Sequence, residues 1–144
     1  MIPQTAQHAG LIERLTHALS GGAAYLRVQC PLHVAHDSVP EPDIALVETP
    51  STLDHHPTTA LLVVEVAVGS HVLDRGRKAE LYAAAGVPAY WVVDVPGARV
   101  EVHRDPKPSG GYGHVRICRG DDELPLDVGG VEPFTVAQLM RRIS

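Results

Sequence analysis

The chain has 144 residues, of which 44% are hydrophobic and 20% are charged, and its formal net charge is -5. This length suits one domain with a real core and is too short for two, and the composition is that of a globular protein rather than a disordered one. The acidic balance argues against a surface coated throughout with basic residues for nucleic acid, although a local basic strip around an acidic site is compatible with it.

Membrane and redox signals are weak in this sequence. Its apolar stretches are far shorter than the ~20 residues that span a bilayer, and the N-terminus lacks a basic region followed by an apolar one. We therefore expect a cytoplasmic protein with no membrane partner. Cys30 and Cys118 are far apart and have no CxxC partner, so they are expected to be free thiols in strand-like segments.

Hydrophobic periodicity predicts helices and strands along the whole chain. The predicted elements are a helix over 5–19, strands over 25–30 (continuing at 32–34), 44–47 and 61–67, a helix over 74–85, strands over 89–94, 99–104 and 112–118, and a helix over 135–143. Asp74 is expected to cap the second helix, and Gly86 and Pro88 to end it. The strand, helix and strand from 61 to 94 form a βαβ-like unit.

Glu65 is the most informative residue because it lies in the apolar strand Leu61–Ala67. A carboxylate within such a strand is costly to desolvate unless a cation or hydrogen bonds compensate it. Alternation places Val63, Glu65 and Ala67 on one face of the strand. The Ala67 side chain is too short and too apolar to compensate the Glu65 charge. A positive group is therefore expected to meet Glu65, and Lys78 lies thirteen residues later on the next predicted helix.

Asp43 offers a second carboxylate, because Pro42-Asp43 opens the short apolar strand 44–47. Two acids and one lysine are the components of a metal-dependent phosphodiesterase: carboxylates hold the metal, and a lysine orients water or stabilises developing charge. In PD-(D/E)XK nucleases the lysine follows the second acid by two residues. Here that position is Ala67, so the pattern by itself is a partial match.

A longer series of motifs carries a resemblance to a known family. Its segments are Arg27-Val28-Gln29, Glu41 to Val47, Val64 to Ser70, Asp74 to Lys78, Leu81-Tyr82, Ala85 to Pro88 and Tyr90 to Asp94. Together they resemble the Uma-two family, a bacterial branch of the restriction-endonuclease-like superfamily. The resemblance covers roughly residues 8–104, and a series of this length is specific where each piece is not.

The resemblance implies a fold and a set of site residues. The expected fold is a single α/β domain over residues 1–144 with a restriction-endonuclease-like core, a mixed sheet flanked by helices. In that branch the lysine is thought to have moved to the following helix, which matches Lys78. The chain is expected to be N-terminally short, since it starts after the helix and hairpin with which family members usually begin.

The implied function is Mg²⁺-dependent (or Mn²⁺-dependent) hydrolysis of DNA phosphodiester bonds. Asp43 and Glu65 would hold the metal with the Val66 carbonyl as an extra ligand, and Lys78 would position water. Further residues that would line the cleft are Asp74, Tyr82 and His8, and His71 is a second histidine to consider there. A homodimer is expected, because two-fold assembly is common and a single site cuts one strand.

Each residue also has a purely structural interpretation. Glu65 could be a strand-end carboxylate with a backbone or arginine partner, and Asp43 could cap a turn after Pro42. Lys78 could be solvated, and Asp74 could be an N-cap that pairs with it along the helix. Tyr82 shares the Lys78 face and could serve packing alone.

Two other classes of function are compatible with the sequence. The first is a non-catalytic nucleic-acid-binding or protein-binding module that keeps the nuclease fold. The second is a self-assembling protein without nucleic-acid contact, which the acidic charge would suit. Metal binding separates the nuclease from both, and salt-dependent DNA affinity separates the two from each other.

Overall fold

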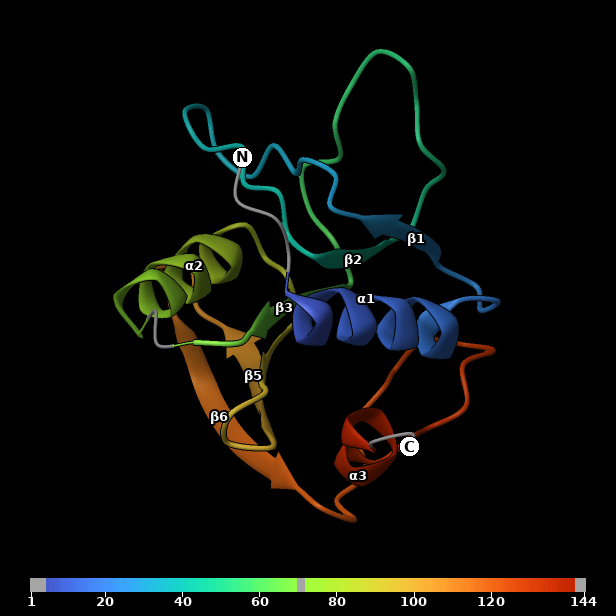
Figure 1. Ribbon diagram of the computed structural model, residues 1–144. Helices are drawn as coiled ribbons and strands as arrows, with labels where there is room; N and C mark the ends of the chain where they lie inside the picture. Colours follow the sequence, from blue (N-terminus) through green and yellow to red (C-terminus); the bar gives the residue numbers. More distant parts are fainter. Residues whose placement is uncertain (1–4, 70–71, 142–144) are drawn as a thin grey trace.

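The computed structural model describes residues 5–69 and 72–141, and of residues 72–75 it describes the backbone alone. Six strands form one sheet in their sequence order (Figure 1). The elements are α1 Ala6–Leu19, β1 Tyr25–Val28, β2 Ile44–Val47, β3 Leu62–Ala67, α2 Val72–Ala84, β4 Ala89–Asp94, β5 Arg99–Pro106, β6 Tyr112–Arg119 and α3 Val136–Met140. Strands β3 and β4 are parallel, whereas the other neighbouring pairs of these strands are antiparallel. The predicted mixed sheet flanked by helices is confirmed.

The sheet has an apolar layer on each face. Helices α1 and α3 cover one face and α2 covers the other (Figure 1). Alternation along β3 divides its side chains as the sequence predicts, because Leu62, Val64 and Val66 pack toward α1 while Val63 and Ala67 pack toward α2. Glu65 therefore has its side chain on the α2 face.

The connection from β3 to β4 determines where the functional side chains lie. Two parallel strands need a crossover, and α2 provides it by packing over the β4 and β5 part of the sheet. Strand β2 runs antiparallel to β3 with Ile44 opposite Val64. Asp43, the residue before β2, therefore lies beside the C-terminal half of β3. Helix α2 follows this end of β3 in the chain.

Several predicted boundaries are wrong. Strand β5 runs to Pro106 rather than to residue 104, and residues 32–34 form no strand. Helix α2 includes Val72 and Leu73, so Asp74 lies within its first turn and is not the N-cap. The helix macrodipole favours an acidic residue in the first turn as well as at the cap, which is why the sequence alone did not separate these positions. Strand β1 ends at Val28 because Gln29 has a φ of 51° and Pro31 has no N–H to donate.

Helix α3 ends at Met140 rather than at Ile143, and residues 142–144 lie outside the described part. Among the described residues Cys30 and Cys118 are both free, as expected, although Cys30 lies beyond the end of β1. Within the same residues no helix has the length and apolar character needed to cross a bilayer.

Candidate active site

Asp43 directly precedes β2 and is held by the neighbouring strand. Its Oδ2 atom accepts a hydrogen bond of 2.8 Å from the Val66 N–H, and its side chain is 13% exposed. A backbone donor that points at one carboxylate oxygen fixes how the group is oriented. This contact goes beyond the turn-capping interpretation, because it ties Asp43 to the residue next to Glu65.

Glu65 receives two side chains from α2. The Tyr82 hydroxyl donates to Glu65 Oε1 at 3.2 Å, and Lys78 Nζ lies 3.6 Å from the same oxygen. Lys78 and Tyr82 are four residues apart, so they share one face of the helix. The cation expected beside Glu65 is therefore Lys78, and Tyr82 is a hydrogen-bond donor as well as a fully buried packing residue.

The environment of Glu65 disfavours its charged form. Burial is the main cause that raises the pKa of Glu65 from 4.5 to about 7. The positive charge of Lys78 opposes this rise, and the Asp43 carboxylate adds to it. Hydrogen bonds from Tyr82 and from the Asp43 backbone also oppose the rise. Burial, and then the negative charge of Glu65, raises the pKa of Tyr82 well above its ordinary value. The phenol therefore stays a donor throughout the physiological pH range.

This raised pKa predicts how stability depends on pH. Between pH 4.5 and about 7 the unfolded chain releases the Glu65 proton while the folded chain keeps it, so the free energy of unfolding must fall as pH rises through this window. Above pH 7 the total decrease in the free energy of unfolding from this group is on the order of 3 kcal/mol. Urea unfolding in EDTA at pH 4.5, 6 and 8 measures it, with Glu65→Gln as the reference that lacks this group.

The two proteins differ in this one ionisable group, so the difference between their profiles reports mainly on Glu65, together with the neighbours to which it is coupled. We expect the glutamine variant to gain stability relative to the parent as the pH rises. Parallel pH profiles for the two proteins would contradict the raised pKa.

His8 joins this group from the first turn of α1. Its Nε2 atom lies 3.2 Å from Asp43 Oδ1 and 3.2 Å from Asp43 Oδ2, and its side chain is 17% exposed. The sequence suggested His8 only as a cleft-lining residue. No sequence pattern pointed to the contact with Asp43, because the two residues are 35 positions apart and belong to elements that are not adjacent in the chain.

The remaining predicted site residues are less defined. Val66 contributes its N–H to Asp43, whereas the role of its carbonyl as a metal ligand stays a prediction. The side chain of Asp74 and all of His71 lie outside the described part. Among the described residues no three His, Cys, Asp or Glu side chains are already placed to hold a metal ion.

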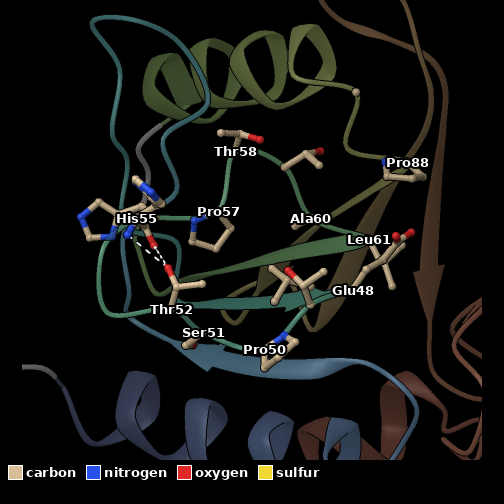
Figure 2. Close-up of a pocket in the computed structure, with 15 residues that line it drawn as sticks. Glu48, Pro50, Ser51, Thr52, His55, Pro57, Thr58, Ala60, Leu61 and Pro88 are labelled. Atoms are coloured by element: carbon tan, nitrogen blue, oxygen red, sulfur yellow. Dashed lines mark hydrogen bonds between the residues drawn. The ribbon is translucent and has the colours of Figure 1, made fainter.

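A separate cavity of about 450 Å³ lies under the loop between β2 and β3. Figure 2 shows residues from Glu48 to Leu61 arching around it, with hydrogen bonds between Thr52 and His55. It lies at the opposite end of these strands from Asp43, since Leu61 precedes Glu65 by four residues, or about 13 Å of strand. Most of its lining side chains are exposed loop residues, so we place the candidate site at Asp43 and Glu65 instead.

The chain is similar to known proteins in its sequence and in its fold. The sequence profile of the Uma2 (Uma-two) family, described as "Putative restriction endonuclease", matches residues 1–137. The chain belongs to the Uma2 family. The resemblance seen in the sequence is thereby confirmed, and it extends over more of the chain than the motifs from residue 8 to residue 104.

A solved structure shares the Uma2 chain's fold. It comes from Anabaena variabilis and is described as "a putative nuclease belonging to DUF820"; the TM-score is 0.74 at 13% sequence identity, with 97% of this chain and 83% of the other chain covered. Similarity at this level of identity supports the nuclease-like fold alone. No protein with curated functional information matches the chain.

Proposed function

We propose that this chain is a Mg²⁺-dependent endonuclease that hydrolyses DNA phosphodiester bonds. The observation that carries the proposal is the convergence of three side chains in a member of the Uma2 family. Lys78 lies 3.6 Å from Glu65, and the Asp43 carboxylate is close enough to raise the pKa of Glu65. These are the residue types that metal-dependent phosphodiester hydrolysis needs.

The donor set fits a magnesium ion. Mg²⁺ keeps several waters and commonly takes only one or two protein carboxylates, so Asp43 and Glu65 suffice without a third acid. Two partly buried carboxylates that repel each other, with a lysine ammonium 3.6 Å from one of them, also favour a divalent cation on electrostatic grounds. The Val66 carbonyl is an additional candidate ligand.

The residues would divide the work as follows. When bound, the ion supplies polarisation of the phosphate and acidifies a water molecule. Asp43 and Glu65 would hold the ion, each oriented by its own donor, Val66 N–H and the Tyr82 hydroxyl respectively. The Lys78 ammonium would orient the attacking water or stabilise negative charge on the phosphate. Cutting both strands of a duplex calls for two sites, so we propose that the protein acts as a homodimer.

Cleavage of a supercoiled plasmid tests the proposal. The purified chain is expected to nick or linearise the plasmid with Mg²⁺ or Mn²⁺ and to be inactive in EDTA. Asp43→Asn should reduce the rate at least about 100-fold, because losing a metal-ligand charge costs several kcal/mol of transition-state stabilisation. Asp54→Asn is the matched control, since Asp54 is an exposed loop carboxylate at the far end of β2.

The controls also separate the competing functions. Absence of cleavage with either metal, or equal cleavage by parent and Asp43→Asn, would contradict the proposal. DNA binding that weakens with salt but leads to no cleavage would instead support the non-catalytic binding module.

A further inference from the structure

Two arginines are neighbours at the end of the sheet that carries the candidate site. Arg99 begins β5 and Arg119 ends β6, and the two are directly opposite each other in this antiparallel pair. On its other side Arg99 is opposite Asp94, which is in turn opposite Ala67. Ala67 ends β3 two residues after Glu65. The row from Ala67 to Arg119 therefore borders the candidate site across four strands.

Both arginines are on the α2 face of the sheet, which is the face of the Glu65 side chain. Val100 and Cys118 belong to the core on the α1 face, so alternation puts the adjacent arginines on the opposite face. Neighbouring strands are about 4.8 Å apart, so the backbones of Arg99 and Arg119 are about 10 and 14 Å from the end of β3. A strand of duplex DNA carries a phosphate about every 3.4 Å along the axis. The arginines are therefore within a few nucleotides of a phosphate bound at the candidate site.

Arg99 is held in place by the turn between β4 and β5. Its Nε atom donates to Asp94 Oδ2 at 2.9 Å, and Asp94 Oδ1 accepts from the Gly97 N–H at 3.2 Å. A Cβ atom on Gly97 would lie 2.7 Å from Asp94 Oδ2 and 3.3 Å from Arg99 Nε, so glycine leaves room for this ion pair. The pair engages Nε, and the Arg99 side chain is 34% exposed. This leaves the terminal nitrogens of the guanidinium group for an anion such as phosphate.

The charges in this row favour an anion. Like charges directly opposite each other in a sheet repel, and Arg99 faces Arg119 while the row contains one acid, Asp94. The backbone of Arg119 is fixed by the turn after β6, because its N–H donates to Asp122 Oδ2 at 2.8 Å, and its side chain is exposed. A phosphate backbone bound to both guanidinium groups would relieve the repulsion and accept charge-assisted hydrogen bonds.

We propose that Arg99 and Arg119 bind the phosphate backbone of the DNA strand that lies across the candidate site. This inference rests on the proposed function and gives the direction of the substrate, which runs from Asp43 and Glu65 across β4 toward β6. The two arginines are positioning residues, because they hold the substrate and do not touch the reacting atoms. Contacts to phosphate carry no sequence information, so the affinity that they add is the same for any DNA sequence.

Duplex binding by the full chain tests the proposal. Fluorescence anisotropy of a labelled duplex is measured over a series of salt concentrations, with Ca²⁺ in place of Mg²⁺ because both ions bind carboxylate oxygens. Arg99→Ala and Arg119→Ala should each weaken binding about 10-fold and reduce the slope of log K against log salt by about one. Arg116→Ala is the matched control, since Arg116 is an exposed arginine on the other face of β6. It should leave affinity and slope nearly unchanged.

Two further variants separate the position of the guanidinium group from its charge. Arg99→Lys keeps the charge but cannot form two parallel hydrogen bonds to a phosphate. Its salt slope should return toward that of the parent while its affinity stays low. Gly97→Ala keeps every charge and crowds the Asp94–Arg99 pair, so it should weaken binding and leave the slope unchanged.

Three results would overturn the inference. They are equal affinity and slope in the parent and both alanine variants, an equal loss in Arg116→Ala, and a parent protein that binds no duplex. Plasmid cleavage by the same preparations would leave the proposed function standing in each case, whereas a parent that neither binds nor cleaves DNA would overturn both. Arg119→Ala changes an exposed side chain, so the test remains decisive if Arg99→Ala fails to fold.

Discussion

Replacing Glu65 by alanine will abolish metal-dependent cleavage and leave the protein folded. Glu65 is the proposed ligand that both Lys78 and Tyr82 contact, so its loss removes a metal ligand and the anchor of the lysine together. We expect cleavage to fall at least about 100-fold. The free energy of unfolding in EDTA at pH 8 should not decrease, because the raised pKa shows that this buried charge is unfavourable in the metal-free protein.

Activity and stability should therefore change independently of each other. Plasmid cleavage and urea unfolding of the same preparations measure the two quantities, and Glu48→Ala serves as the control because Glu48 is exposed at the other end of β2. Unchanged cleavage by Glu65→Ala would remove Glu65 from the site. A large loss of stability would show that the Glu65 carboxylate stabilises the fold rather than binding a metal ion.

Replacing Lys78 by alanine should also cause a large loss of activity. Its ammonium lies 3.6 Å from Glu65 and its side chain is 35% exposed, so the residue can contact both the carboxylate and a substrate in solvent. We expect the cleavage rate to fall about 100-fold or more, as when one stabilising donor is lost from a transition state. Arg77→Ala is the control, since Arg77 is the exposed neighbouring cation on the same helix.

A second substitution tests whether activity depends on where the ammonium group lies rather than on which residue carries it. Ala67 lies on the same face of β3 as Glu65, two residues along, and packs in the α2-side core. Lys78→Ala combined with Ala67→Lys should recover part of the activity. The recovery is expected to be incomplete, because positioning errors near ~1 Å can cost ~100-fold in rate. If Lys78→Ala alone cleaves as well as the parent, the lysine on α2 has no catalytic role.

Much of the fold follows from local patterns. Alternation along 61–67 assigned each β3 side chain to the correct face, and the glycine and proline after residue 85 marked the end of α2, where Gly86 has a φ of 77°. These predictions hold because backbone geometry and the burial of apolar side chains act over a few residues. The start of α2 was wrong because acidic residues suit both a cap and a first turn.

The chain by itself also determined which chemical groups are present: one carboxylate just before a strand and one within the next strand, a lysine on the following helix and the motifs of the Uma2 family. Only the tertiary structure decided that Tyr82 and Lys78 meet one oxygen of Glu65, and that His8 contacts Asp43. Such contacts depend on the register between β2 and β3 and on which face of the sheet each helix covers. Register and helix placement arise from packing between segments far apart in the chain, so no local pattern of residues encodes them.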